Sequence, residues 1–192
     1  DYGDYFYYLK RQLVFAALGI IAMYTAMNVD YWVLRNYAKI GLIVCFALLV
    51  VVLIPGVGVV RGGARSWLGI GSLGIQPSEF MKLGLIVFLA KMLSNERFDI
   101  TSFAKGLMPP LLLVGAAFGL IMMQPDLGTG AVLVGASLIV IYTAGAKLTH
   151  LALLGLAGLA GFVALIAAAP YRLQRIVAFL DPWQDPLGAG YQ

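Results

Sequence analysis

The chain has 192 residues and a formal net charge of +4, and 61% of its residues are hydrophobic whereas only 11% are charged. Because soluble domains carry about 25% charged residues, the chain cannot cover a water-soluble fold with a polar surface. The small, scattered positive charge argues against nucleic-acid binding, and the single cysteine, Cys45, excludes an internal disulfide.

Apolar segments recur along the chain and predict an all-α, polytopic membrane protein. Lipid offers the backbone no hydrogen-bond partners, so an apolar segment of about 18 to 20 residues crosses it as a helix. The basic residues divide evenly between the two sides of these segments, so their distribution does not orient the chain. We expect one membrane domain over residues 1–192, with spans at about 12–29, 38–56, 77–94, 106–125, 127–146 and 148–170.

Two loops are expected before the third span. A short polar loop containing Tyr31, Trp32, Arg35 and Lys39 is predicted between the first two spans. A longer, glycine-rich loop follows at 57–76, and its string W-L-G-I-G-S-L-G-I predicts a short hairpin at the membrane interface. The loop also matches the pattern G-x-G-x-x-G. A dinucleotide-binding loop needs a βαβ unit, however, and here the flanks are membrane spans.

The third span begins with the residues Gln76-Pro77-Ser78-Glu79 and carries Lys82 about one turn further on. Pro77 suits the first position of a helix, and Glu79 falls in the first turn, where the helix dipole favours an acid. Lys82 lies three residues after Glu79, so the two side chains can pair. Two interpretations are open: a self-neutralised pair at the membrane entry, or a lysine that faces a cavity or partner. We favour the second.

Asp126 interrupts two apolar segments, within the string Q-P-D-L-G-T. A carboxylate in this position caps the helix that follows. It can equally be the buried partner of Lys82 from a neighbouring span. The residues alone do not separate these two interpretations.

Charged residues gather again in the segment 170–192, beyond the last predicted span. Arg172 and Arg175 would share a helical face, either as snorkelling side chains or as a clamp for phosphate, which guanidinium geometry suits. Asp181 and Asp185 each precede a proline, which restricts their backbone. Such a carboxylate suits general-base catalysis, but on the residues alone a simple Asp-Pro turn is favoured.

Four motifs, in this order and spacing, resemble the SEDS family of bacterial cell-wall proteins. They are G-A-R-S-W-L-G, Q-P-S-E-F-M-K-L, Q-P-D-L-G-T and Y-R-L-Q-R-I-V-A-F-L-D-P-W-Q-D-P-L-G-A-G-Y-Q. The strings M-N-V-D-Y-W and L-I-P-G-V-G-V-V-R-G-G-A-R-S-W look most similar to the sporulation members. The resemblance implies a ten-helix fold in the bacterial plasma membrane. This chain would hold spans two to seven and part of the large extracellular loop, with loops 57–76 and 170–192 facing outward.

The SEDS family polymerises the glycan strands of peptidoglycan from lipid II. The resemblance therefore implies a peptidoglycan glycosyltransferase that serves sporulation, division or shape maintenance. It places the essential loop aspartate at Asp185, as the catalytic base, rather than at Asp181. Glu79 and Asp126 match polar positions within or near the membrane. The residues expected to bind the lipid-linked substrate are Arg65, Trp67, Lys82, Arg172 and Arg175.

The resemblance also implies a partner, a class B penicillin-binding protein that cross-links the product. A divalent cation, Mg²⁺ or Mn²⁺, is a candidate cofactor, although no ligand set is visible in the sequence. Two other functions stay open. One is a lipid II flippase, for which Glu79, Lys82 and Asp126 would line a headgroup pathway. The other is a non-catalytic scaffold for cell-wall enzymes. The chain alone is expected to be inactive, because the substrate groove needs the spans that it lacks.

Overall fold

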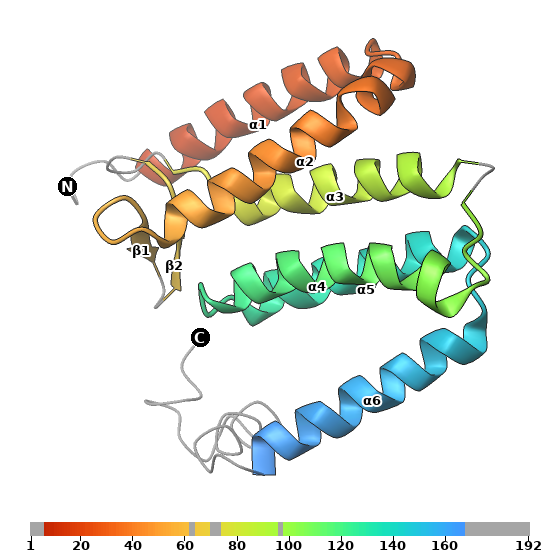
Figure 1. Ribbon diagram of the computed structural model, residues 1–192. Coiled ribbons are helices and arrows are strands. Elements are labelled where there is room, and N and C mark those ends of the chain that lie inside the picture. Colours follow the sequence, from red (N-terminus) through yellow and green to blue (C-terminus); the bar gives the residue numbers. More distant parts are fainter. Residues whose placement is uncertain (1–5, 62–63, 70–73, 96–97, 168–192) are drawn as a thin grey trace.

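The computed structural model describes residues 6–61, 64–69, 74–95 and 98–167, which form a bundle of helices with one short hairpin (Figure 1). α2 to α5 form its packed centre, whereas α1 lies at the periphery and α6 leans away from the bundle. In chain order the elements are α1 (Tyr7–Met27), α2 (Tyr31–Leu53), β1 (Val59–Arg61), β2 (Ala64–Trp67), α3 (Pro77–Leu93), the π-helical turn η1 (Phe103–Leu107), α4 (Met108–Met122), α5 (Leu127–Thr143) and α6 (Leu148–Ala167).

The hydrophobic core lies where α3 packs against α2 and α5, with α4 beside them. In α3, the residues Met81, Leu85 and Leu89 are fully buried. Their four-residue spacing places them on one face of the helix, and the neighbouring helices use similar spacings. The residues that face them are Leu42, Cys45 and Leu49 in α2, Val114, Ala117 and Ile121 in α4, and Leu133 and Ile141 in α5.

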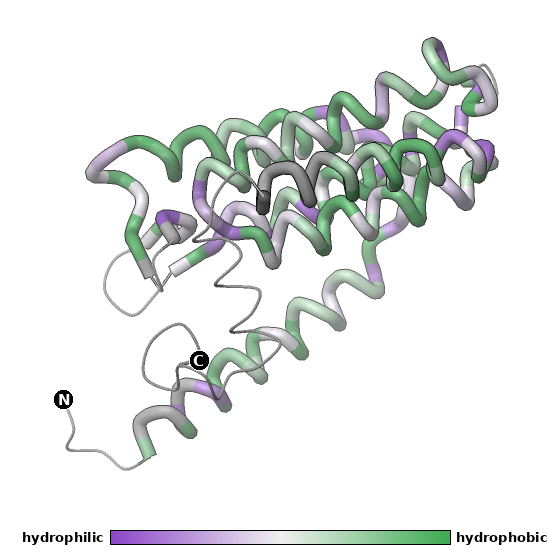
Figure 2. The backbone as a smooth tube through the Cα atoms, turned by 90° about the horizontal axis from the view of Figure 1, so that it is seen from below, coloured by the Kyte–Doolittle hydropathy of each residue, from purple (hydrophilic) through white to green (hydrophobic). Residues whose placement is uncertain are grey.

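The outward faces of the helices are apolar as well, and the hydrophobic colour follows much of the helices' length (Figure 2). Leu83, Leu112 and Ile139 are each about two-thirds exposed. Apolar surface on this scale is unfavourable in water and indicates contact with lipid or with further protein. Within the described residues, Tyr31–Leu53 and Phe103–Met122 are long and apolar enough to cross a membrane, and shorter apolar helices occupy Gln12–Met27, Leu127–Thr143 and Leu148–Ala160.

The prediction of a loop between the first two spans is wrong, because the residues from Tyr31 to Lys39 form the first turns of α2. Asp30 starts this helix, and its Oδ1 accepts a hydrogen bond of 3.0 Å from the Trp32 backbone N–H. Charge alone suggests a loop for Arg35 and Lys39, but long cationic side chains also fit the end of a membrane helix, where they reach toward water. α2 therefore begins seven residues before the predicted span at 38–56.

The hairpin lies mostly upstream of the string that predicts it and shares only Trp67 with that string. β1 and β2 pair antiparallel with Val60 opposite Arg65, because the valines of β1 favour an extended backbone more than the glycine-rich string does. After Trp67, the described residues of the string form one further bridge, in which the backbones of Leu68 and Ile75 exchange hydrogen bonds of 2.8 and 2.7 Å. β2 contacts both α2 and α3, so the hairpin lies over one end of the bundle (Figure 1).

Gly84 allows α2 and α3 to approach each other closely. A Cβ atom added at this position would lie 2.9 Å from Cys45 Sγ, closer than nonbonded atoms normally approach. We expect Gly84→Val to push the helices apart and to lower the free energy of unfolding by about 1 to 3 kcal/mol. Gly115→Val in α4 is the matched control, since nothing lies within 4 Å of its Cβ position. Equal melting temperatures for the two variants in detergent would contradict the close approach.

Candidate functional site

Polar side chains gather at one end of the bundle, which we call the hairpin end. Here α2 ends, the hairpin lies over the bundle, α3 and α5 begin and α4 ends (Figure 1). Gln76 and Gln124 lie at this end, each directly before a proline. The antiparallel order of the helices therefore brings together three polar segments that are far apart in the sequence. They are the hairpin, the start of α3 and the connection from α4 to α5.

Asp126 links α3 to α5 at the hairpin end. Its Oδ2 accepts a hydrogen bond of 2.7 Å from Nε2 of Gln76, the residue that precedes the first turn of α3. The same carboxylate caps α5, since Oδ1 accepts from the Thr129 backbone N–H at 3.1 Å and Oδ2 from the Thr129 hydroxyl at 2.8 Å. Three donors thus engage this carboxylate, and it serves as a helix cap.

Lys82 pairs with Glu79 on the same helix rather than with Asp126. Lys82 Nζ donates to Glu79 Oε1 at 2.8 Å, and the two side chains are 22% and 54% exposed, respectively. The lysine is therefore the more buried partner. Its ammonium has further N–H donors beyond the one given to Glu79, so it can bind an anionic group that approaches the hairpin end.

Arg65 and Trp67 lie on the hairpin and share one face of β2, because alternate side chains of a strand point the same way. Both are half-buried, whereas Ser66 between them is 2% exposed. The aliphatic stem of Arg65 packs over Gly58, where an added Cβ would lie 2.8 Å from Arg65 Cγ. The hairpin thus presents a cation and an aromatic ring together.

Gln124 and Ser78 are buried polar residues that the sequence interpretation does not single out. Both are fully buried, and neither the Gln124 amide nor the Ser78 hydroxyl has a hydrogen-bond partner among the described residues. An unpaired buried group of this kind costs about 1 to 3 kcal/mol. Native proteins pair nearly all such groups, so we expect an ordered water or another part of the protein to bond them. The sequence signal that could have identified these two residues is a Gln-Pro string, Gln124-Pro125 in one case and Gln76-Pro77-Ser78 in the other.

The remaining candidate residues, Asp185, Arg172 and Arg175, lie outside the described residues, as does Asp181. The described part of the site therefore consists of the Lys82–Glu79 pair, the Asp126 cap, and Arg65 and Trp67 on the hairpin. The cations Lys82 and Arg65 can bind an anion. The carboxylates of Glu79 and Asp126 already accept hydrogen bonds from neighbouring side chains.

The described residues do not fit a divalent metal site. No group of three or more His, Cys, Asp or Glu side chains comes together within them. Glu79 is already bonded to Lys82, and Asp126 to Gln76 and Thr129. A cation would have to displace these donors, so no chemical step is assigned to a metal here.

We expect Asp126→Ala to lower the free energy of unfolding by about 2.5 to 4 kcal/mol. The variant loses the α5 cap, worth about 1 kcal/mol, and the charged hydrogen bond from Gln76, worth about 1.5 to 3 kcal/mol. Asp30→Ala is the matched control, because Asp30 caps α2 but bonds only within its own turn. Thermal unfolding should show a clearly larger loss at Asp126. Similar losses would mean that the bond to Gln76 contributes nothing.

The sequence profile of the FtsW, RodA and SpoVE family, described as cell cycle proteins, matches residues 1–192. The chain is 56% identical over 191 residues to stage V sporulation protein E of Bacillus subtilis (strain 168), covering 100% of this chain and 52% of that protein. It is 36% identical to the probable peptidoglycan glycosyltransferase FtsW of Geobacter sp. (strain M18), with the same coverage. The chain thus spans about half the length of these relatives.

Solved structures share the fold as well. A chain from a peptidoglycan synthase complex that coordinates polymerization and crosslinking matches with a TM-score of 0.80 and 34% identity, over 94% of this chain and 53% of that one. The rod shape determining protein RodA of Thermus thermophilus matches with a TM-score of 0.67 and 33% identity, over 80% of this chain and 50% of that one.

The helical bundle, with its apolar outer faces, two helices among the described residues that are long enough to cross a membrane and polar side chains gathered at one end, is typical of a helical membrane protein. Within that class, the chain belongs to the FtsW/RodA/SpoVE family, which is the SEDS family that its four sequence motifs resemble.

Proposed function

We propose that the protein containing this chain is a peptidoglycan glycosyltransferase, which polymerises lipid II into glycan strands for sporulation, division or shape maintenance. The observation that carries the proposal is the half-buried Lys82 at the hairpin end, fixed by Glu79 and left with free donors. Lipid II leaves behind a lipid diphosphate, and a positioned cation stabilises that developing charge. Relatives named as probable peptidoglycan glycosyltransferases support this assignment.

In the proposed architecture, residues 1–192 form one membrane domain with six of the ten helices of the complete fold. The hairpin end, with loops 57–76 and 170–192, would face outward from the bacterial plasma membrane. The apolar outer faces of the helices support this placement in lipid. The undecaprenyl chain of lipid II would lie in an apolar groove between helices.

In the proposed reaction, Asp185 takes the proton from the 4-hydroxyl of the acceptor sugar. The acceptor oxygen attacks the anomeric carbon of the donor and forms the new glycosidic bond. The bond from that carbon to the diphosphate oxygen breaks, and the lipid diphosphate leaves with the electron pair. Lys82, Arg65, Arg172 and Arg175 would bind its charge, whereas Trp67 would contact the substrate.

Glu79 would orient Lys82, and Asp126 would hold Gln76 and so fix the start of α3. A class B penicillin-binding protein would cross-link the product. The match to a chain from a peptidoglycan synthase complex supports such a partner. A divalent cation, Mg²⁺ or Mn²⁺, stays a candidate whose ligands would have to come from outside the described residues.

A polymerisation assay tests the proposal. Purified full-length protein, mixed with its penicillin-binding partner and lipid II in detergent, should produce glycan polymer. A second arm places the protein in liposomes and follows movement of the lipid II headgroup across the membrane, because the half-buried pair of Lys82 and Glu79 also suits a flippase. Translocation without polymer would favour the flippase, and neither activity would favour a scaffold.

A further inference from the structure

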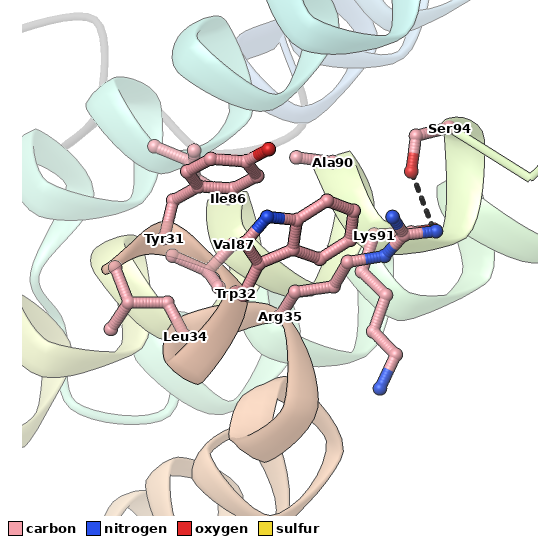
Figure 3. A pocket seen from close by; sticks show the side chains of 9 residues that line it. All are labelled: Tyr31, Trp32, Leu34, Arg35, Ile86, Val87, Ala90, Lys91 and Ser94. Carbon is pink, nitrogen blue, oxygen red and sulfur yellow. Dashed lines mark hydrogen bonds between the residues drawn. The ribbon is translucent and has the colours of Figure 1, made fainter.

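A pocket of about 460 Å³ lies between the first turns of α2 and the last turns of α3 (Figure 3). This is the end of the bundle opposite to the hairpin end, so the pocket is separate from the candidate glycosyltransferase site. Its walls come from both helices, with Trp32 and Arg35 on α2 and Val87 and Lys91 on α3.

The pocket is cationic. Arg35 and Lys91 line it, and among the residues that the structure describes no acidic side chain does. The guanidinium of Arg35 lies 5.0 Å from the centre of the Trp32 ring, and this stacking holds the group in place before any ligand arrives. Neither cation forms an ion pair with a described residue.

Two acids that the structure describes at this end of the bundle, Asp30 and Asp99, have donors of their own. Asp30 accepts from the Trp32 backbone N–H. Asp99 accepts from the Thr101 hydroxyl at 2.6 Å and from the Thr101 N–H at 3.0 Å, and these bonds hold the pKa of Asp99 below its usual value, with a smaller contribution from Lys147. Neither of these two acids neutralises the pocket, so its positive charge is available to an anion as far as the described residues are concerned.

The remaining wall of the pocket is apolar, with Leu34 from α2 and Ile86 and Val87 from α3. A small hydrated anion would leave this wall uncovered, whereas an amphiphile covers both the charged and the apolar parts. α2 is also long and apolar enough to cross a membrane. Tyr31 and Trp32 in its first turn are the residue types that lie at the level of lipid headgroups.

We propose that this pocket binds an anionic glycerophospholipid of the membrane. The headgroup phosphate lies between Arg35 and Lys91, and an acyl chain covers the apolar wall beside Val87. Because the two cations belong to different helices, the bound lipid bridges α2 and α3. It does so at the end of the bundle opposite to the Gln76–Asp126 bond, which joins α3 to α5.

Lipid binding to the full-length protein tests this site, with native mass spectrometry from detergent as the readout. The probes are phosphatidylglycerol and phosphatidylcholine with identical acyl chains. We expect wild type to retain phosphatidylglycerol preferentially. Arg35→Gln and Lys91→Gln should each weaken its binding about fivefold, and the double variant about 25-fold, as expected for loss of cations at a membrane surface. Lys39→Gln combined with Lys105→Gln removes the same charge from exposed positions outside the pocket and should leave binding unchanged.

Ala90→Trp tests the apolar wall without changing charge, because it fills the pocket and should displace the lipid. Equal retention of the two lipids, or equal binding by the double variant and its control, would overturn the proposal. Loss of bound lipid in millimolar inorganic phosphate would instead show a simple anion site. Absence of bound lipid from the wild-type protein would also overturn the proposal.

Discussion

Replacing Asp185 with alanine in the full-length protein is expected to lower the rate of lipid II polymerisation by about 10²- to 10⁴-fold, the usual contribution of a general base. Asp185 would accept the proton of the attacking hydroxyl, and alanine cannot. Asp185→Asn should fall to a similar rate, since it keeps the shape of the side chain but removes the basic oxygen. Single-turnover polymerisation with the penicillin-binding partner present measures the effect.

Asp181→Ala is the matched control for Asp185→Ala. Asp181 precedes a proline in the same segment, carries the same charge and is expected to be a turn residue without a chemical role. It should therefore retain activity close to wild type. Equal losses for the two variants would mean that the segment as a whole was disturbed. Undiminished activity of Asp185→Ala would remove that residue from the catalytic role.

Replacing Lys82 with methionine is expected to lower polymerisation about 10²- to 10³-fold, the effect of removing one positioned group that stabilises developing charge. Methionine keeps much of the length and volume of the side chain. Glu79 stays more than half exposed, so it can be solvated after losing its partner. Lys105→Met, in the η1 turn at the other end of the bundle, is the control for loss of one lysine.

An exchange of the two charges separates a binding role from a structural one. The double variant Glu79→Lys with Lys82→Glu can restore the ion pair but moves the cation by almost one helical turn. If Lys82 binds the diphosphate, activity should stay low although the melting temperature recovers. If the pair only stabilises α3, both should recover, and that outcome would contradict the substrate-binding role of Lys82.

Much of the helical bundle could be predicted from the sequence, because apolar segments and the residues that start a helix determine structure locally. α3, α5 and α6 begin at Pro77, Leu127 and Leu148, which are also the first residues of the predicted spans. Pro77 suits a first turn, and Asp126 caps the turn that follows it. The start of α2 could not be predicted in the same way, because its first turns carry charges that are equally compatible with a loop.

The partners within the site could not be predicted, because they depend on contacts between helices. The sequence leaves Asp126 as either a cap or the partner of Lys82, and only the packing of α3 against α5 brings Gln76 within 2.7 Å of it. The Lys82–Glu79 pair is a local property of one helix with a spacing of three residues, and it is one of the two interpretations of the sequence, although the sequence favours a cavity or partner for Lys82. The burial of Gln124 likewise depends on how the bundle packs at the hairpin end, which no single segment encodes.

Because α6 leans away from the bundle, a small rotation at its first turns would displace its last turns by a larger distance. The helix packs against the core through Leu151 and Leu154 near its start, next to Gly145, whose φ of 99° interrupts the chain between α5 and α6. A helix of 20 residues is about 30 Å long, so a rotation of about 10° at its base would displace its far end by about 5 Å. The segment with Asp185 follows that far end in the chain. We therefore expect a change in the tilt of α6 to move the start of the segment that carries Asp185, the proposed catalytic base. Spin-label distances between α5 and the end of α6 would measure it, and a single narrow distance with and without lipid II would exclude such a movement.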